Sequence, residues 1–281
     1  MINIATVHWQ DERWIDVQLD YLRRKITSPF RVYAWLNDIP GDHRHKFHYV
    51  NTEWVRQHAI KLNILADLIY FDSNRDDDLI FFLDGDAFPI GDVVGFVRER
   101  LEKYPLVAVQ RLENNGDLQP HPCFCATTVG FWKRIGGNWN PGHTWQNPQG
   151  NPVTDVGGNL LGILQRENVD WYPMHRSNRV NLHSLWFGIY EGVIYHHGGA
   201  FRVPLSRIDK QHAAAEAKDT WRWPLMLFID RIAGLDRSLR WFKHLSPVRS
   251  LEKRIIRRSS GLNAQMFQKL RSDPEFYREL N

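Results

Sequence analysis

The sequence contains little cysteine and no long hydrophobic run. Its 281 residues include two cysteines, Cys123 and Cys125, and a disulfide between residues so close in an extended segment would be strained. We therefore expect free thiols in a reducing compartment. No apolar stretch approaches the roughly 20 residues that span a bilayer, and the start, MINIATVHWQDERW, lacks the basic and apolar regions of a signal peptide. These absences predict a cytoplasmic protein without a transmembrane segment.

Several common functional motifs are also missing. Neither G-x-G-x-x-G after a strand nor G-x-x-x-x-G-K-[ST] occurs, which argues against a Rossmann dehydrogenase and a P-loop kinase. No ordered set of nucleophile, histidine and acid indicates a hydrolytic triad. The net charge of +4 and the pI of about 9.1 suit an anionic ligand such as a phosphate, or an anionic membrane surface. They do not distinguish between these two partners.

The first 110 residues alternate between strand-like and helix-like patterns, which implies a parallel sheet with helices on both faces. In the second predicted helix, Trp54 shares the buried face with the apolar residues that follow it. The expected strands are 2–9, 30–36, 78–84 and 106–110, and the expected helices are 13–26, 52–70 and 92–104.

Loops and short elements are expected from residue 111 to about 179, where Gly, Pro, Asn and Trp are frequent. Within this part, residues 154–168 have the pattern of a helix, with Thr154 or Asp155 as its N-cap. Residues 187–202 predict a strand followed by a glycine turn.

The last segment, residues 219–280, is amphipathic and increasingly basic. Such a stretch is typical of a helix on an anionic membrane surface or of a helix packed on the domain with a solvated basic face, and the sequence leaves both open. Between residues 237 and 258, eight basic residues accompany a single acid, Glu252: Arg237, Arg240, Lys243, Arg249, Lys253, Arg254, Arg257 and Arg258.

Two aspartates, Asp84 and Asp86, follow the buried strand in FFLDGDAFPI. Ligands of parallel sheets bind at the carboxyl ends of the strands, so this pair lies at the functional edge. Like charges held together need a compensating charge, and carboxylate oxygens favour Mg²⁺ or Mn²⁺. Gly85 permits a tight backbone between them. The alternative interpretation is a plain turn at a strand end.

Two further motifs offer side chains to such a site. An imidazole from His196 or His197 would complete a metal site with the aspartates, and Gly198 and Gly199 would let the backbone approach a phosphate. The alternative is that both histidines only cap a strand. Asp155 is either a catalytic or acceptor-binding carboxylate, or a helix N-cap.

Taken in order, the strand-helix half, Asp-x-Asp, CATTVGFW, DVGGNLLGIL and YHHGGAFR resemble the GT-A class of nucleotide-sugar glycosyltransferases over residues 1–205. The resemblance implies an α/β fold with a GT-A-like mixed, mainly parallel sheet flanked by helices, and a helical C-terminal segment. It also implies a nucleotide-binding half, 1–110, an acceptor half, 111–205, and a basic amphipathic segment, 206–281.

The resemblance also implies which residues form the metal site and the donor site. It implies a metal site of Asp84, Asp86 and one of the two histidines, and we prefer His197 over His196 because it adjoins the glycine turn. The residues expected to bind the nucleotide and the donor, together with the aspartates, are Thr6, His8, Trp9, Asn37, Asp38, Lys61, Gly85, Gly198 and Gly199.

The function implied by the resemblance is metal-dependent sugar transfer from a UDP- or GDP-type donor to a glycan, lipid-linked or other hydroxyl acceptor. Mn²⁺ or Mg²⁺ would stabilise the diphosphate leaving group. Asp155 is the candidate base if the enzyme inverts, and a positioning group if it retains. The expected cytoplasmic location and the basic tail, and not the resemblance, indicate a setting in polysaccharide or glycolipid assembly, in the cytoplasm or peripherally on the inner membrane face.

Two rival functions remain. A sugar-phosphate nucleotidyltransferase needs a glycine-rich loop after the first strand, and VHWQDERW has no glycine there. A non-catalytic, GT-A-like protein that binds a glycan or nucleotide is disfavoured by the intact acidic pair. Nucleic acid is not an expected partner, because the basic residues lie on one terminal segment without a recognised binding motif.

Overall fold

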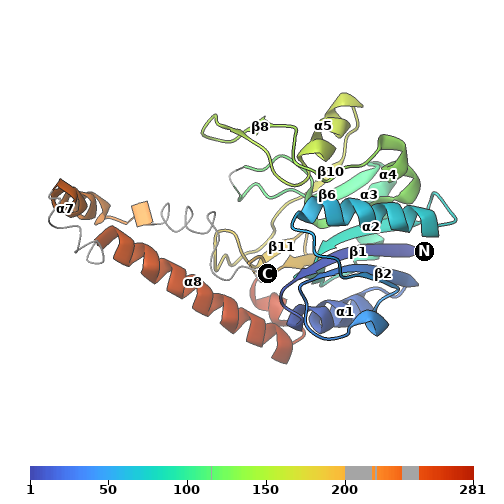
Figure 1. The fold of residues 1–281 in the computed structure, drawn as a ribbon, viewed down its shortest axis with the longest axis horizontal. Coiled ribbons are helices and arrows are strands. Elements are labelled where there is room, and N and C mark those ends of the chain that lie inside the picture. The colour runs from blue at the N-terminus through green and yellow to red at the C-terminus, as the bar shows by residue number, and fades with distance from the viewer. Residues whose placement is uncertain (115, 200–216, 219, 236–246) are drawn as a thin grey trace. The chain divides into compact units, whose positions relative to one another are not determined.

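The computed structural model describes residues 1–114, 116–199, 217–218, 220–235 and 247–281 (Figure 1). The chain forms two compact units, one of Met1–Ala200 with Pro274–Asn281 and one of Phe201–Asp273. The predicted boundary between residues 205 and 206 lies outside the described residues, as do Arg237, Arg240 and Lys243.

A seven-stranded sheet forms the centre of the first unit, in the order β10-β6-β7-β4-β1-β2-β3. Every neighbouring pair is parallel except those that involve β7, which runs antiparallel to β4 and β6. The predicted fold class, a GT-A-like mixed and mainly parallel sheet flanked by helices, is confirmed. The strands are β1 (Ile2–Trp9), β2 (Phe30–Asn37), β3 (Tyr49–Asn51), β4 (Leu79–Asp84), β6 (Leu106–Val109), β7 (His121–Thr128) and β10 (Tyr172–Met174).

Two small sheets complete the strands of this unit. One is three-stranded and antiparallel, in the order β11-β12-β5, and the other pairs β8 with β9. The single strand expected in residues 187–202 is therefore a hairpin, β11–β12, whose second strand continues the pairing to β5. Their bounds are β5 (Ala87–Pro89), β8 (Trp145–Gln146), β9 (Pro152–Val153), β11 (Gly188–Tyr190) and β12 (Ile194–His196).

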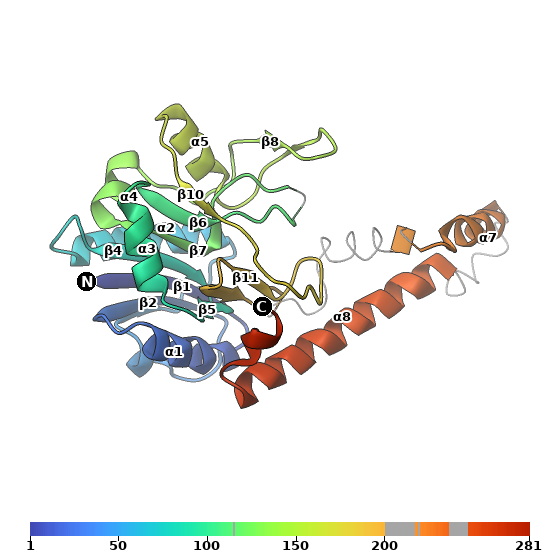
Figure 2. The same ribbon diagram turned by 180° about the vertical axis from the view of Figure 1, so that it is seen from behind.

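Helices cover both faces of the large sheet, as Figures 1 and 2 show. Successive strand residues point to opposite faces, so Phe81 joins the core under α1 and α3, and Phe82 joins the core under α2, α4 and α5. The helices are α1 (Arg13–Lys25), α2 (His58–Asp72), α3 (Val93–Leu101), α4 (Val129–Ile135) and α5 (Gly158–Arg166), with short 3₁₀ turns at Arg44–Lys46 and Phe276–Glu279.

The helix predicted over residues 52–70 starts later than expected. It begins at His58, and Trp54 precedes it with 66% of its surface exposed. Two tertiary hydrogen bonds hold the preceding segment extended: Trp35 Nε1 donates to the Glu53 carbonyl at 2.8 Å, and the Val55 amide donates to Asn37 Oδ1 at 3.0 Å. Side chains of β2 therefore hydrogen-bond to the backbone of residues 53 and 55. From helical spacing alone, those residues were predicted to form the first turn of the helix.

The helix predicted over residues 154–168 is also shorter than expected. It begins at Gly158, and its N-cap is Gly157 with φ of 92°, in the left-handed region that favours glycine. The predicted caps have other partners, since Thr154 Oγ1 accepts from the Gly142 amide and Asp155 Oδ1 accepts from the Val156 amide. Neither Thr154 nor Asp155 is the N-cap.

In the described part of the second unit, helices α7 (Trp223–Leu235) and α8 (Pro247–Ser272) pack against each other. The expected helical C-terminal segment is thus present. Among the described residues, no helix is both long and apolar enough to cross a bilayer. Cys123 and Cys125 are buried and free, as expected from their spacing.

Candidate metal and nucleotide site

The two aspartates lie where β4 turns into β5, at the carboxyl edge of the sheet. Asp84 is the last residue of β4, and Asp86 immediately precedes β5. The Gly85 amide donates to the Val7 carbonyl at 3.1 Å, so the turn is tied to the neighbouring β1. A Cβ on Gly85 would lie 2.7 Å from both the Val7 carbonyl oxygen and His8 Nδ1, which leaves no room for a side chain there.

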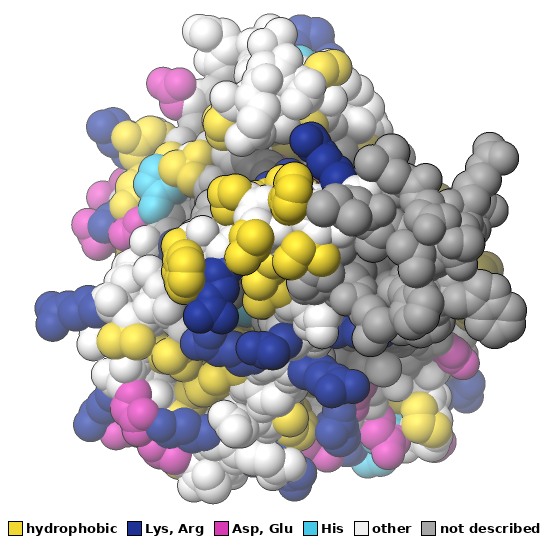
Figure 3. Space-filling model, turned by 90° about the vertical axis from the view of Figure 1, so that its left-hand side faces the viewer, with side chains coloured by type: hydrophobic (Ala, Val, Ile, Leu, Met, Phe, Trp, Pro, Cys, Tyr) yellow, Lys and Arg dark blue, Asp and Glu magenta, His cyan; other side chains and the backbone are white. Residues whose placement is uncertain are grey.

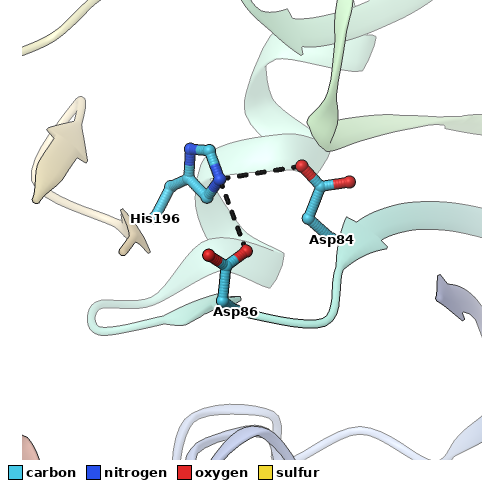
Figure 4. A group of neighbouring side chains, drawn as sticks. All are labelled: Asp84, Asp86 and His196. Atoms are coloured by element: carbon cyan, nitrogen blue, oxygen red, sulfur yellow. Dashed lines mark ion pairs between the residues drawn. The ribbon is translucent and has the colours of Figure 1, made fainter. Parts of the chain in front are cut away.

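His196 reaches both carboxylates from the neighbouring small sheet (Figure 4). Strand β12 places it opposite Ala87 of β5. Its Nε2 lies 3.6 Å from Oδ2 of Asp84 and 3.4 Å from Oδ1 of Asp86. One ligand atom from each of the three residues lies within 4.8 Å of the other two. Two carboxylates and an imidazole form a donor set that a divalent cation accepts.

Two further histidines, His58 and His121, lie beside Asp84 and were not predicted. His58, the first residue of α2, places Nε2 at 3.0 Å from Asp84 Oδ1. His121 begins β7, and its ring centroid lies 6.1 Å from that of His196. Because β4 and β7 are antiparallel, the start of β7 meets the end of β4. Only strand pairing could reveal His121, since it lies far from Asp84 in the sequence.

The electrostatics of the turn keep both carboxyl groups in the ionised form that binds metal. Burial alone raises the pKa of Asp84, but the His58 hydrogen bond and the surrounding imidazoles outweigh burial, so this pKa lies well below its usual range. Burial likewise raises the pKa of Asp86, and the charge and hydrogen bond of His196 reverse the effect. The same negative charge would attract a cation.

His197, the preferred ligand, is not part of the group that Asp84, Asp86 and His196 form. Adjacent strand residues point to opposite sides, and His197 is fully buried, with Nδ1 2.9 Å from the Tyr195 hydroxyl. Its ring packs 4.7 Å from that of Trp14 and 5.0 Å from that of Phe187. The structure thus groups His196, and not the preferred His197, with the two carboxylates, because proximity to the glycine turn does not determine which side chain lies beside them.

Substituting each histidine separately tests this grouping. If the three residues hold a metal, we expect His196→Ala to weaken Mn²⁺ binding by about tenfold or more, because one of the three candidate ligands is lost. We expect His197→Ala to keep most of the metal affinity and to lower the free energy of unfolding by about 2 to 4 kcal/mol, because it leaves a buried cavity. Calorimetric Mn²⁺ titration and thermal denaturation measure the two effects. Loss of metal binding only in the His197 variant would restore the original assignment.

Thr6 and His8, which were expected to bind the nucleotide, are fully buried beneath the turn. Both contact Gln18 of α1: the Thr6 hydroxyl donates to Gln18 Oε1 at 2.9 Å, and His8 Nε2 lies 3.2 Å from the same oxygen. Burial lowers the pKa of His8 to about 4, so its ring is neutral at pH 7. Gln18 Nε2 in turn donates to the carbonyls of Asp84 and Ala87, at 2.8 Å each. These side chains hold the turn from below.

Trp9, Asn37 and Lys61 lie together at the carboxyl ends of β1 and β2, beside α2. Lys61 Nζ lies 4.4 Å from the centroid of the Trp9 ring and 3.3 Å from Asn37 Oδ1. Lys61 is 1% exposed and forms no ion pair within the described part of the chain. Asn37 Nδ2 is buried and has no hydrogen-bond partner among the described residues. Asp38, next in sequence, is exposed and accepts from Gln10 Nε2 at 2.9 Å.

The glycine turn after β12 takes the conformation that its sequence predicts. Gly198 and Gly199 have φ of 63° and 92°, both in the left-handed region. A Cβ on Gly199 would lie 2.9 Å from the Trp186 ring. Both positions therefore need glycine for the backbone to turn back past Trp186.

Asp155 lies in the loop before α5 with an exposed side chain. A second acid, Asp117, lies close enough for the charge of Asp155 to raise its pKa. Asp117 is 5% exposed, accepts from Asn114 Nδ2 at 2.6 Å, and has a pKa raised to about 6, chiefly by burial. Sequence reasoning missed Asp117, because nothing in the local pattern distinguishes it from a loop carboxylate.

Comparison with known proteins gives weak similarity. No protein-family model and no curated protein matches the sequence. Among solved structures, the chain is similar to S. aureus TarS, with 10% identity and a TM-score of 0.36 over 50% of this chain and 30% of that one. It is also similar to S. aureus TarS 1-349, with 8% identity and a TM-score of 0.41 over 78% of this chain and 66% of that one.

This chain therefore spans less than two thirds of each matched TarS chain. At such identities and TM-scores, neither match assigns an activity or a substrate to it. We base the function on the chain's own sheet, turn and ligand group.

Proposed function

We propose that this protein is a metal-dependent glycosyltransferase that moves a sugar from a nucleoside-diphosphate donor to a hydroxyl acceptor. The observation that carries the proposal is the group of Asp84, Asp86 and His196 at the carboxyl edge of the sheet. These three residues would hold Mn²⁺ or Mg²⁺, which supplies charge neutralisation at the departing diphosphate when bound. Gln18 and Gly85 fix the turn that orients both carboxylates.

The cluster of Trp9, Asn37 and Lys61 supports a nucleotide-diphosphate donor. A buried ammonium without an acidic partner is costly, and a phosphate would compensate its charge. The buried Asn37 Nδ2 offers a hydrogen bond to an acceptor on a base or ribose. Trp9 supplies an aromatic surface beside both. We propose this cluster, with exposed Asp38 at its border, as the nucleotide subsite of a UDP- or GDP-type donor, and Gly198 and Gly199 as backbone near the diphosphate.

The titration of Lys61 gives a test that needs no substrate. Burial lowers its pKa from an ordinary value of 10.5 to about 8. Between pH 8 and 10.5 the unfolded state therefore binds more protons, and this group makes the free energy of unfolding rise with pH across that window. We expect Lys61→Met to increase stability at pH 7 and to flatten the rise, as measured by urea denaturation at several pH values. Identical pH slopes for both proteins would contradict the buried, unpaired ammonium.

On the acceptor side, we propose Asp155 as the catalytic or acceptor-positioning carboxylate. General-base catalysis contributes about 10²- to 10⁴-fold, so we expect Asp155→Asn to lower kcat by that range and Asp117→Asn to lower it less. The charge of Asp155 raises the pKa of Asp117, so the Asp155 variant should also shift any Asp117 titration to lower pH. A larger loss of kcat in the Asp117 variant would transfer the role to that residue.

A thermal-shift screen of UDP, GDP, CDP and dTDP, each with and without Mn²⁺, tests the proposal. A ligand that binds only the folded state raises the melting temperature by mass action. A shift that requires Mn²⁺ and one nucleotide, and that disappears in Asp84→Ala, would support the donor site. No shift with any pair would refute it.

Product analysis separates the rival functions. A nucleotidyltransferase releases pyrophosphate, whereas a glycosyltransferase releases a nucleoside diphosphate. Metal-dependent nucleotide binding without turnover on glycan or lipid-linked acceptors would indicate a non-catalytic binding protein. The cytoplasmic location remains a prediction, and fractionation of cells that express the chain would test it.

A further inference from the structure

The charge of the chain is divided very unevenly along its length. Residues 221–272 contain twelve Lys and Arg against three Asp and Glu, an excess of nine, whereas the whole chain has an excess of only four. The remaining residues therefore carry 24 basic against 29 acidic side chains, a net charge of −5. The basic character of the protein lies entirely in the helical second unit.

Helix α7 in this unit is apolar without interruption from Trp223 to Ile229, in the run WPLMLFI. A helix that is apolar on all sides is normally buried in a core or in a membrane. Fourteen large hydrophobic side chains are exposed among the described residues, and five of them fall within nine positions here. The five are Trp221, Leu225, Leu227, Phe228 and Ile229.

Helix α8 adds a charged face to the same unit. Leu251, Ile255, Leu262, Met266 and Leu270 recur at helical spacing and are buried or half-buried. Four basic side chains in the first half of this helix are exposed on another face: Lys253, Arg254, Arg257 and Arg258. Near its end, Lys269 is half-buried and Arg271 is exposed.

Exposed apolar and basic side chains occur next to each other on the surface. Figure 3 shows a group of exposed hydrophobic side chains with Lys and Arg side chains beside it. Arg222 and Arg231, at either end of the apolar run, are exposed as well. Exposed Trp, Phe and Leu next to Lys and Arg are the composition of helices that lie in a membrane interface.

We propose that the α7–α8 unit docks the protein on a lipid bilayer that contains anionic lipids, with α7 in the interface and the basic face of α8 against the headgroups. Apolar side chains enter the headgroup boundary, and each Lys or Arg near an anionic surface adds to the attraction. Charge complementarity favours an anionic bilayer as the binding partner. The excess of nine positive charges would attract a surface of diffuse negative charge, and the exposed apolar run would enter the acyl boundary beneath that surface.

Flotation of the full-length protein with vesicles tests the proposal. We expect binding to phosphatidylcholine vesicles that contain phosphatidylglycerol, little binding to phosphatidylcholine alone, and weakening of binding by salt. Leu225→Ser with Phe228→Ser, and separately Arg254→Glu with Arg257→Glu, should each reduce binding by about tenfold or more. The two pairs test the apolar and the charged contribution independently.

Matched controls come from exposed residues of the first unit. Phe71→Ser removes a side chain that is 81% exposed on α2, and Arg98→Glu reverses an exposed charge on α3. Both should bind vesicles like the wild type. Every variant should retain the nucleotide- and Mn²⁺-dependent thermal shift, so failure of the membrane proposal is distinguishable from failure of the transferase proposal.

Three results would overturn the membrane proposal. The first is absence of vesicle binding, and the second is equal binding by the wild type and both double variants. The third is a dimer, detected by light scattering without vesicle binding, that dissociates in the Leu225 and Phe228 double variant. That last result would assign the apolar face of α7 to a second copy of this chain.

Discussion

Replacing Asp86 with alanine is expected to abolish metal-dependent transfer while leaving the fold intact. Asp86 contributes a buried carboxylate oxygen to the group of three residues that could hold a metal ion, and its lowered pKa keeps that oxygen ionised at neutral pH. Loss of the ligand removes the charge that would hold the cation beside the diphosphate. The expected loss in kcat/KM is at least about 10³-fold, the scale of electrostatic stabilisation at a leaving group.

The measurement combines turnover with the Mn²⁺-dependent thermal shift. We expect Asp86→Ala to retain a cooperative unfolding transition and to lose the shift that Mn²⁺ and nucleotide give the wild type. Asp67→Ala is the matched control, because Asp67 is exposed on α2, away from the turn. Wild-type turnover in the Asp86 variant would remove the metal site from the mechanism.

Replacing Gln18 with alanine is expected to lower the stability of the protein and to weaken metal binding at the proposed site. One fully buried carboxamide accepts from the Thr6 hydroxyl, contacts His8 and donates to the carbonyls of Asp84 and Ala87. Alanine leaves several buried polar groups without partners, at about 1 to 3 kcal/mol each. We expect the free energy of unfolding to fall by about 3 to 5 kcal/mol and the melting temperature by about 10 °C.

The positioning role of Gln18 predicts more than instability. The two hydrogen bonds that Gln18 donates flank the Asp84–Asp86 turn. At a low temperature where Gln18→Ala remains folded, this variant should therefore bind Mn²⁺ more weakly than the wild type. Thr6→Val, which removes only one of the bonds, should have a smaller effect on metal affinity. Gln165→Ala, on the exposed side of α5, is the neutral control. Unchanged Mn²⁺ affinity in folded Gln18→Ala would show that the turn holds its geometry without this side chain.

The elements of the sheet were predictable where periodicity and composition agree. Strands β1, β2, β4 and β6 match apolar runs, and helices α1 and α3 match the spacing of apolar residues. The start of α2 was wrong because Asn37 and Trp35 engage the backbone that precedes it. The start of α5 was wrong because Gly157, not Thr154 or Asp155, occupies the cap. Both errors are at element ends, where tertiary hydrogen bonds override local propensity.

Within the site, the Asp-x-Asp pair was predictable and its surroundings were not. A strand that ends in two carboxylates at the ligand edge of a parallel sheet needs no knowledge of distant residues. The histidines around that pair come from α2, β7 and β12, and their convergence depends on strand order. Thr6 and His8 were expected to bind the nucleotide, yet both contact Gln18 of α1, which covers the face of β1 that carries them.

The sequence by itself determined the α/β class, the strand-end position of Asp84 and Asp86, and the basic, amphipathic character of the C-terminal helices, because each follows from local periodicity and charge. Only the tertiary structure decided which histidine meets the carboxylates, that Gln18 fastens the turn, and that Asp117 lies near Asp155. Side-chain direction on a short strand, and the pairing of groups from distant segments, depend on register and packing. Register and packing are determined by the whole chain and not by any short stretch of it.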